Sequence, residues 1–395
     1  MNETFRYNPY SPKQIDQHVY QDLSRSGELS AAIGPNNVML QVNYACYLRC
    51  QMCDRHAWGS SGAPLRKILN ISELNDLIDQ LQTLQTRKIT LVGTEPVMRE
   101  DLPQILIDIR SKGIKPELYT AGIKLDDNII QAILDTETDV AFSVDGFNPD
   151  SHNGIRMPDK LFDAFGRTLQ SVYRLKQARE ERSLDADHVR ISANFTIQNG
   201  NILDLTTVTA EDIDRIGVDT LRMALVHGSG PYQLNNSSLG ILKSFVAKLE
   251  SLQTITEVDL SAGIKYAAFG LIRAGDFDNN VLVPSSYLEP QNHSHCHIGE
   301  YSVMIDPQGN VRPCIYLSDD NGPFTDKSRD EFIMGNIKYQ RFSDIWFGEK
   351  YAAFRKSNFP DMTTASKCRT CEYMEDFDAM DRAAAKPQRV LRIGW

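Results

Sequence analysis

The sequence predicts an α/β fold in which strands of a parallel sheet alternate with helices. Apolar runs of strand length, each bounded by turn residues, recur along the first part of the chain, and helical patterns lie between them. Strands that alternate with helices form parallel sheets through right-handed crossovers, and six such units would make an incomplete (β/α)6 barrel. The predicted strands lie near residues 38–43, 89–93, 116–120, 139–144, 189–197 and 219–226.

The helices predicted between these strands carry recognisable start and stop signals. An apolar stripe begins after Ser72, which is a suitable N-cap. Asp101 can cap a second helix that runs to Gly113, a residue suited to the position just after a helix end. Asp126 opens a third helix, residues 160–181 form a fourth, and a further helical pattern covers 239–252.

Composition limits both the class of protein and its partners. The chain has 395 residues, of which 41% are hydrophobic, enough for two or three domains with a sizeable core. A net charge of −10 argues against nucleic acid as the main partner, because phosphate binding needs a basic surface. The chain has no apolar run of transmembrane length and no N-terminal signal peptide, so we expect no membrane association and a cytoplasmic location.

Seven cysteines fall into clusters, which favours metal ligation in a reducing compartment over disulfides. The first cluster is Cys46-Tyr-Leu-Arg-Cys50-Gln-Met-Cys53, directly after the first predicted strand. Three thiolates can bind three irons of a cubane cluster and leave the fourth iron open, as a catalytic site requires. The alternative is a set of buried or zinc-binding cysteines, although zinc sites usually pair two C-x₂-C units.

A second cysteine set lies in the C-terminal third of the chain. Cys296 and Cys314 bracket a predicted hairpin that turns at Asp306-Pro307-Gln308-Gly309, and Cys368 and Cys371 form a C-x₂-C pair. Four thiolates complete one tetranuclear iron–sulfur cluster or one zinc site, and on the residues alone the two metals are equally favoured.

The first cysteine loop resembles the signature of the radical S-adenosylmethionine (SAM) superfamily, with Met52 where an aromatic residue is usual. The resemblance implies a TIM-like partial barrel and a [4Fe–4S] cluster on Cys46, Cys50 and Cys53, with SAM chelated at the open iron. Strand ends carry supporting motifs. Gly93-Thr94-Glu95-Pro96 is similar to the family's Gly-Gly-Glu-Pro, and Thr120-Ala121-Gly122 to its Thr-Asn-Gly. Active sites of such folds lie at the carboxyl ends of the strands.

The resemblance also suggests SAM-binding residues on the later strands. Ser143-Val144-Asp145-Gly146, followed by His152 and Arg156, is similar to a pattern of the SPASM branch, although these charged groups could instead stabilise the loop. Arg222 is a candidate catalytic residue that could bind a carboxylate or an oxyanion, or form an internal salt bridge. The predicted cofactor-binding residues are Gly93, Thr94, Glu95, Pro96, Ser143, Asp145, Asn194 and Arg222.

The C-terminal region resembles the SPASM-type radical SAM enzymes in its shorter "twitch" form. The resemblance rests on Met334-Gly335-Asn336-Ile337, on 342–346, and on the C-x₂-C pair, with no later cysteine. It implies one auxiliary [4Fe–4S] cluster on Cys296, Cys314, Cys368 and Cys371. The expected organisation is a leader at 1–37, a partial barrel at 38–231, a bridge at 232–295, an auxiliary domain at 296–371 and a C-terminal helix and tail at 372–395.

With all seven cysteines assigned, none remains to donate a hydrogen atom to a substrate radical, as epimerases of this type usually require. We therefore expect a SAM-derived radical to oxidise a substrate C–H, by cross-linking or dehydrogenation, with an electron passing toward the auxiliary cluster. The substrate is a ribosomally made peptide or a sugar or aminocyclitol, and a flavodoxin- or ferredoxin-type protein supplies reducing electrons. The alternatives are an epimerase with a non-cysteine hydrogen donor and a non-catalytic iron–sulfur or zinc protein.

Overall fold

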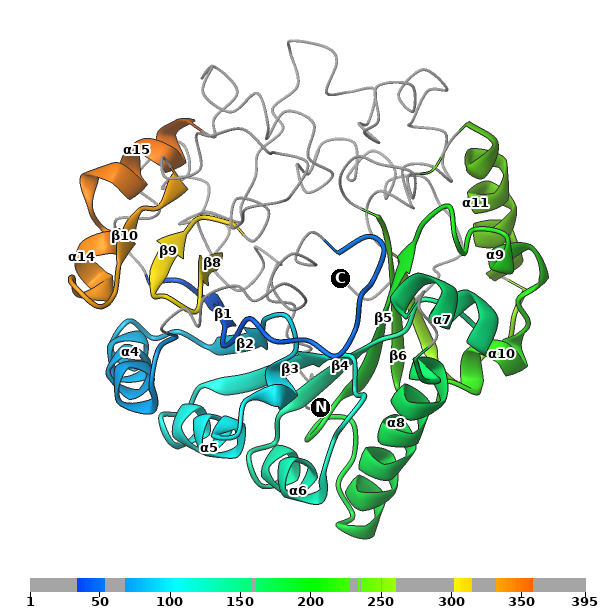
Figure 1. Ribbon diagram of the computed structural model, residues 1–395, viewed down its shortest axis with the longest axis horizontal. Coiled ribbons are helices and arrows are strands. Elements are labelled where there is room, and N and C mark those ends of the chain that lie inside the picture. Colours follow the sequence, from blue (N-terminus) through cyan, green and yellow to red (C-terminus); the bar gives the residue numbers. More distant parts are fainter. Residues whose placement is uncertain are drawn as a thin grey trace, which may run out of the picture.

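The computed structural model describes residues 34–53, 68–157, 161–226, 234, 236–249, 251–260, 302–314 and 332–357. The described strands form one curved sheet in the order β10-β9-β8-β1-β2-β3-β4-β5-β6-β7 (Figure 1). The six strands of the predicted barrel are all present and all parallel, and the sheet stays open, which confirms the partial barrel. They are β1 (Asn37–Gln41), β2 (Lys88–Val92), β3 (Lys115–Thr120), β4 (Asp139–Ser143), β5 (Ile191–Ile197) and β6 (Thr220–Leu225).

The sheet extends beyond these six strands on both sides. Strand β7 (Glu257–Leu260) pairs parallel with β6 and comes from the stretch expected to be a bridge. On the other side β8 (Ser302–Ile305) pairs parallel with β1, and β9 (Asn310–Arg312) returns antiparallel to it as the predicted hairpin. A short strand, β10 (Gly335–Asn336), completes this edge. The start of the auxiliary region is therefore hydrogen-bonded directly to the first barrel strand.

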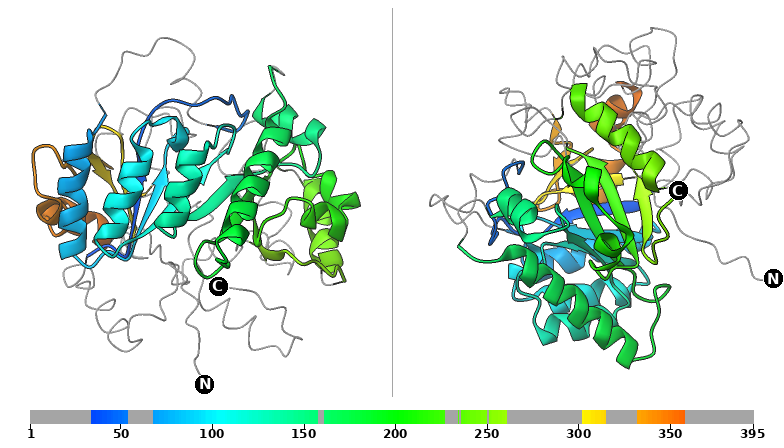
Figure 2. Two further views of the ribbon diagram at one scale, coloured as in Figure 1. Left: turned by 90° about the horizontal axis from the view of Figure 1, so that it is seen from below. Right: turned by 90° about the vertical axis from the view of Figure 1, so that its right-hand side faces the viewer.

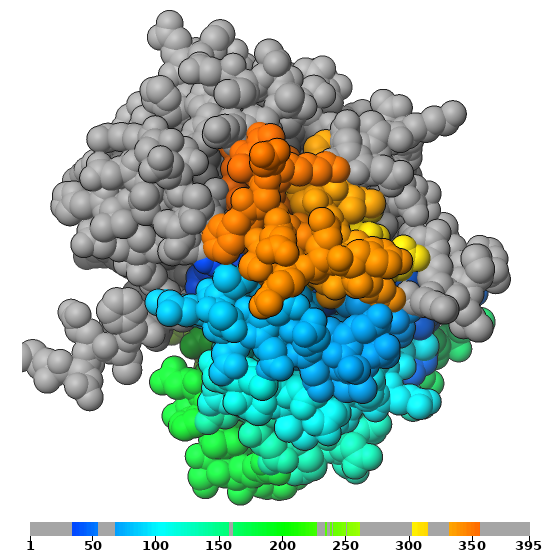
Figure 3. Space-filling model, turned by 90° about the vertical axis from the view of Figure 1, so that its left-hand side faces the viewer, coloured from blue at the N-terminus to red at the C-terminus, as the bar shows by residue number. Residues whose placement is uncertain are grey.

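Helices cover the outer face of the sheet, as Figures 1 and 2 show for α4, α5, α6 and α8. The helices near the barrel strands are α4 (Ile71–Thr83), η2 (Pro96–Met98), α5 (Leu102–Ser111), α6 (Asp127–Asp135), α7 (Pro149–Arg156), α8 (Ala164–Glu181), α9 (Asp204–Thr207), α10 (Ala210–Asp214) and α11 (Asn236–Leu249). Two more, α14 (Phe342–Trp346) and α15 (Glu349–Ser357), follow β10. Figure 3 shows this last segment, in orange, lying against α4, where the Gln80 amide oxygen accepts from the Phe342 N–H at 2.7 Å.

The outer face is apolar because alternate strand residues meet the apolar stripes of the helices. Leu40 of β1 and Leu74, Leu77 and Ile78 of α4 are at most 1% exposed and belong to one large core cluster. The N-cap of α4 is Asn70 rather than the predicted Ser72. Its side chain accepts from the Glu73 N–H while Glu73 accepts from the Asn70 N–H, a capping box that Ser72 is placed too late to form.

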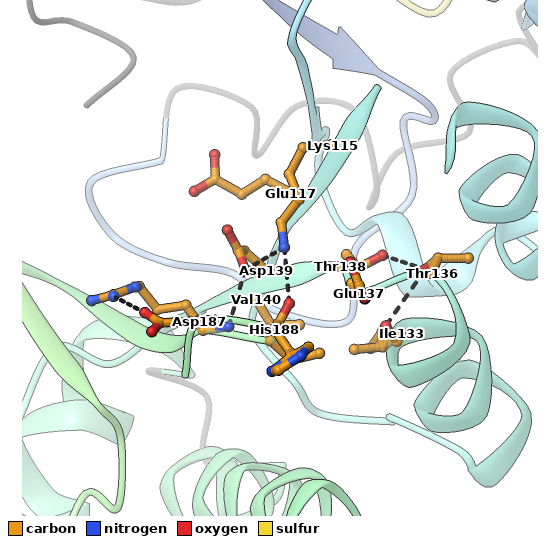
Figure 4. A network of polar contacts seen from close by, with 12 residues as sticks. Lys115, Glu117, Ile133, Thr136, Glu137, Thr138, Asp139, Val140, Asp187 and His188 are labelled. Atoms are coloured by element: carbon orange, nitrogen blue, oxygen red, sulfur yellow. Dashed lines mark hydrogen bonds and ion pairs between the residues drawn. The ribbon is translucent and has the colours of Figure 1, made fainter. Parts of the chain in front are cut away.

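Polar side chains tie the strands together at the amino-terminal end of the barrel (Figure 4). The Lys115 ammonium donates to the His188 carbonyl at 2.9 Å and pairs with Asp139 at 3.2 Å, and Asp139 also accepts from the Arg190 N–H at 3.0 Å. In folds of this kind that end serves stability, while the opposite end carries the chemistry. Among the helices that the structure describes, none is sufficiently long and apolar to cross a membrane.

Candidate active site

The loops that follow β1 and β2 are held together by one buried asparagine. The Asn43 amide donates to the Glu95 carbonyl at 2.7 Å, and its oxygen accepts from the Thr94 hydroxyl at 3.1 Å. The Thr94 hydroxyl also contacts the Ala45 carbonyl, one residue before the first cysteine. Thr94, which replaces a glycine of the family pattern, therefore anchors the start of the cysteine loop, a role that glycine could not fill.

The cysteine loop rests on the carboxyl end of α7. The Arg49 N–H donates to the Arg156 carbonyl at 3.2 Å, and the Gln51 N–H to the Ile155 carbonyl at 2.9 Å. The Gln51 amide adds a bond to the Gly154 carbonyl at 2.9 Å. Carbonyls at a helix end lack partners within the helix, so the loop satisfies them and gains a fixed position in return.

Arg156 connects the cysteines to the loop after β4. One guanidinium nitrogen lies 3.7 Å from the Cys50 sulfur, and the other pairs with the Asp145 carboxylate at 2.7 Å. Asp145 is fully buried and also accepts from the Thr196 N–H at 2.7 Å. His152, buried beside it, accepts from the Asp145 N–H at 3.2 Å, and burial with the Arg156 charge lowers its pKa well below the usual value. These groups stabilise the loop in this structure, one of the two roles expected from the sequence.

Three thiols on one loop are a donor set that suits an iron–sulfur cluster. Burial raises the pKa of Cys46 and Cys50 to about 12, so these thiols keep their protons until a metal displaces them. The Leu48 N–H donates to the Cys46 sulfur at 3.3 Å, and such bonds to sulfur are typical of cluster ligands. Among the described residues, no group of three or more His, Cys, Asp or Glu side chains is placed to hold a metal ion.

Glu95, in the loop after β2, is buried at the carboxyl end of the sheet. Its carboxylate is 1% exposed and accepts from the Thr120 hydroxyl at 2.5 Å and from the Ala121 N–H at 2.8 Å. Burial raises its pKa, and these donors oppose the rise. Glu95 therefore joins the ends of β2 and β3. A carboxylate has about four acceptor positions, so Glu95 can still accept a further hydrogen bond. Its predicted role in binding SAM stays a prediction.

Gly122, in the loop after β3, has a backbone conformation that favours glycine. Its φ is +69°, and an added Cβ would lie 2.7 Å from the Phe142 ring. We expect Gly122→Ala to destabilise the fold by on the order of 3 kcal/mol through backbone strain and overpacking together. Gly113→Ala is the matched control, because Gly113 has φ +74° but nothing within 4 Å; it should cost only about 1 kcal/mol. If chemical unfolding showed that both variants lose the same free energy of unfolding, the steric argument would be contradicted.

Ser143, Asn194 and Arg222 occupy one row across the inner face of the sheet. Ser143 is in register with Asn194, and Asn194 with Arg222. The Arg222 guanidinium lies 3.4 Å from the Glu117 carboxylate on β3, so the internal salt bridge considered for Arg222 is present. Burial alone would raise the pKa of Glu117, but Lys88 at 2.8 Å and Arg222 hold it at about 2. The predicted contacts of this row with SAM or substrate stay predictions.

Three polar residues of the barrel interior were not among the predicted site residues. Lys88 and Glu117 form a buried ion pair, and their signal in the sequence is a charge inside an otherwise apolar strand pattern. Gln41, at the end of β1, is 1% exposed, and neither amide atom has a hydrogen-bond partner among the described residues. An unpaired buried amide is costly, so Gln41 is a further position at which the site can receive a polar ligand.

The buried ion pair between Asp145 and Arg156 should be sensitive to loss of its carboxylate. We expect Asp145→Asn to destabilise the protein by about 3–5 kcal/mol, because Arg156 then lacks its countercharge in a buried site. Chemical unfolding measures the change in stability. The iron retained after gel filtration shows whether the cysteine loop still holds metal. Asp185→Asn is the control, since the Asp185–His188 pair is exposed and such pairs contribute little. A similar small effect for both variants would count against the role given to Asp145.

The second cysteine set is only partly described. Cys314 lies just after β9 and is half-buried, whereas Cys296, Cys368 and Cys371 lie outside the described residues. On α15, Tyr351 is completely buried, and the Arg355 guanidinium lies 4.0 Å from the centre of the Tyr351 ring.

Two family models match the chain. The model of the radical SAM superfamily matches residues 40–183, and that of SPASM, an iron–sulfur cluster-binding domain, matches residues 296–372. The matches include Cys46, Cys50 and Cys53 in the first region and the four remaining cysteines in the second.

Curated relatives match along most of their length. A tungsten-containing aldehyde ferredoxin oxidoreductase cofactor-modifying protein of Pyrococcus furiosus is 21% identical, and the match covers 86% of this chain and 89% of the relative. An AdoMet-dependent heme synthase of Methanosarcina barkeri is 24% identical, over 86% and 89%. The mycofactocin maturase MftC of Mycolicibacterium smegmatis is 23% identical, over 85% and 75%.

Solved structures share the fold. Streptococcus suis SuiB bound to S-adenosylmethionine has a TM-score of 0.60 and 14% identity, covering 93% of this chain and 78% of its own. SuiB has also been solved with its precursor peptide SuiA. The protein anSMEcpe with bound AdoMet has a TM-score of 0.57 and 14% identity, covering 85% and 88%.

Proposed function

The chain belongs to the radical SAM superfamily and carries a SPASM iron–sulfur region, and from this premise we propose that it oxidises a peptide substrate at an unactivated C–H bond. Family membership makes the chain an enzyme that uses SAM and iron–sulfur clusters. The alternative of a non-catalytic iron–sulfur or zinc protein is therefore wrong.

The described residues include the proposed ligands for the first cluster. Cys46, Cys50 and Cys53 would ligate it, and Arg156 would direct positive charge at the Cys50 sulfur. A [4Fe–4S] cluster with SAM supplies a 5′-deoxyadenosyl radical that can abstract hydrogen from a carbon. We propose that SAM is oriented by residues of the loops after β2 and β4 and of strands β4, β5 and β6: Gly93, Thr94, Glu95, Pro96, Ser143, Asp145, Asn194 and Arg222.

One observation carries the proposal of a net oxidation. The two proposed ligand sets use all seven cysteines, so no thiol remains to return a hydrogen atom to a substrate radical. The substrate instead loses one hydrogen atom to the adenosyl radical and then one electron and one proton. The product gains a double bond, a carbonyl or a cross-link. An auxiliary cluster held by Cys296, Cys314, Cys368 and Cys371 would supply an electron acceptor.

A peptide is the favoured substrate class. The mycofactocin protein is named a maturase, and SuiB was crystallised with a precursor peptide. Two other relatives are named for modifying a cofactor or making heme, so a small molecule is the second candidate and would extend the sugar or aminocyclitol alternative. We further propose that a flavodoxin- or ferredoxin-type donor reduces the enzyme in the reducing cytoplasm, because the cysteines are arranged for metal rather than disulfides.

Coexpression with a short peptide encoded next to its gene tests the proposal directly. We expect a product lighter by two hydrogen atoms, together with 5′-deoxyadenosine and methionine, in mass spectrometry. The same reaction in deuterated solvent separates the alternatives, because an epimerase would leave the constitution unchanged and place solvent deuterium on one carbon. That outcome would overturn the oxidation and favour a non-cysteine hydrogen donor.

A further inference from the structure

The end of helix α7 holds the cysteine loop on both sides of Cys50. The Arg49 N–H, just before this cysteine, donates to the Arg156 carbonyl at 3.2 Å. The Gln51 N–H, just after it, donates to the Ile155 carbonyl at 2.9 Å. Because these are backbone bonds, they hold Cys50 at the end of α7 whatever side chain residue 156 carries. The side chain of Arg156 can therefore be considered separately from this backbone anchor.

The Arg156 side chain returns to the same cysteine. Its Nη1 donates to the Cys50 sulfur at 3.7 Å, while its Nε has no hydrogen-bond partner among the described residues. Arg156 is 9% exposed and Cys50 is 8% exposed, and salt and water screen buried charges only weakly. One guanidinium therefore directs an almost unscreened positive charge at this sulfur and keeps a further buried N–H unused. Both features suit a negatively charged group bound at the thiols.

Asp145 fixes the direction of this guanidinium. Its carboxylate, which is 0% exposed, pairs with Nη2 of Arg156 at 2.7 Å and accepts from the Thr196 N–H at 2.7 Å. Nη1 therefore meets Cys50 while Nη2 meets Asp145, so the positive member of the ion pair is the one that contacts the sulfur. An arginine keeps its proton in proteins, so this charge is permanent.

We propose that the Arg156 side chain raises the reduction potential of the cluster held by Cys46, Cys50 and Cys53, and that Asp145 limits this rise. Reduction adds one negative charge, so a buried cation and a hydrogen bond to ligand sulfur both stabilise the reduced form. A flavodoxin- or ferredoxin-type donor then reduces a larger fraction of the enzyme. The inference rests on the proposed function only for these three cysteines as ligands. Arg156 acts through the Cys50 sulfur and is therefore a positioning residue.

The test is a redox titration of the SAM-free holoenzyme followed by electron paramagnetic resonance. The first cluster is identified by the signal that changes when SAM is added afterwards. We expect Arg156→Gln, which removes the charge and keeps the backbone bonds, to shift the midpoint of this cluster to a more negative potential and to leave the auxiliary midpoint unchanged. Arg156→Lys retains the charge and should restore part of the shift. An unshifted first midpoint in Arg156→Gln would overturn the inference.

Two further variants separate tuning from loss of stability. Arg179→Gln is the matched control, because Arg179 is 5% exposed and pairs with Asp219 at 2.6 Å before β6, at the opposite end of the strands. It should move neither midpoint, and an equal shift there would overturn the inference. The double variant Arg156→Gln with Asp145→Asn leaves no unpaired buried charge, so it permits the titration if the single variant loses iron. Its first midpoint should lie between those of wild type and Arg156→Gln, and a wild-type midpoint would contradict the role of Arg156.

A second measurement needs only the wild-type protein. When its arginines carry a heavy nitrogen isotope in the guanidinium group, electron–nuclear double resonance of the reduced, SAM-free enzyme should detect that nitrogen coupled to the first cluster. Arg156→Lys should lose this coupling, and its absence from wild type would overturn the inference. If Cys50→Ala keeps the SAM-responsive signal, the ligand assignment of the proposed function fails and the inference fails with it, whereas an unshifted midpoint in Arg156→Gln overturns the inference alone.

Discussion

Cys50→Ala should halve the bound iron and reduce SAM cleavage to background. Cys50 is 8% exposed within the rim, and its sulfur contacts the buried Arg156. Removal of the thiol leaves two ligands for the cluster and takes away the sulfur that lies against the Arg156 guanidinium. Iron analysis of the reconstituted protein and quantification of 5′-deoxyadenosine check both effects. SAM cleavage at the wild-type rate would exclude this loop as the radical-forming site.

Cys314→Ala should halve the iron as well, but with a different functional consequence. The loop proposed to form the radical follows β1 and contacts Arg156 of the segment after β4, whereas Cys314 follows β9. We therefore expect 5′-deoxyadenosine to form still, while the oxidised product is lost because the substrate radical has no acceptor for its electron. Product mass spectrometry alongside 5′-deoxyadenosine quantification measures the two separately.

The two cysteine variants control for each other, because each removes one thiol and half of the iron. If Cys314→Ala formed the oxidised product at the wild-type rate, the auxiliary cluster would not be the electron acceptor. If both variants lost SAM cleavage equally, the loss would reflect a general failure of the fold. Circular dichroism of both proteins would then identify that failure.

The strands and most helices of the barrel could be predicted because their signals are local. A buried parallel strand reads as a short apolar run, and an outer helix as an apolar stripe. Asp126 caps α6 as predicted, with its side chain accepting from the Ile129 N–H. The N-cap of α4 was misplaced by two residues because Asn70 and Ser72 are both good caps, and only the reciprocal bond with Glu73 decides between them.

Contacts between residues far apart in the sequence could not be predicted. Strand β7 is short and half-buried, so residues 257–260 give little apolar signal, and their place is set by pairing with β6. The pairing of β8 with β1 joins segments more than 250 residues apart. The Thr94 contact with Ala45 likewise depends on two loops that meet only when the sheet forms.

The sequence alone determined the parallel α/β fold and the set of three closely spaced thiols on one loop, because strand periodicity and ligand spacing are properties of short segments. Only the tertiary structure decided which groups surround that loop. It placed Arg156 between Asp145 and Cys50, and it turned Glu95 inward to Thr120. Hydrogen bonds and ion pairs have strict distance requirements, so they are fixed only once the packed sheet brings separate strand ends together.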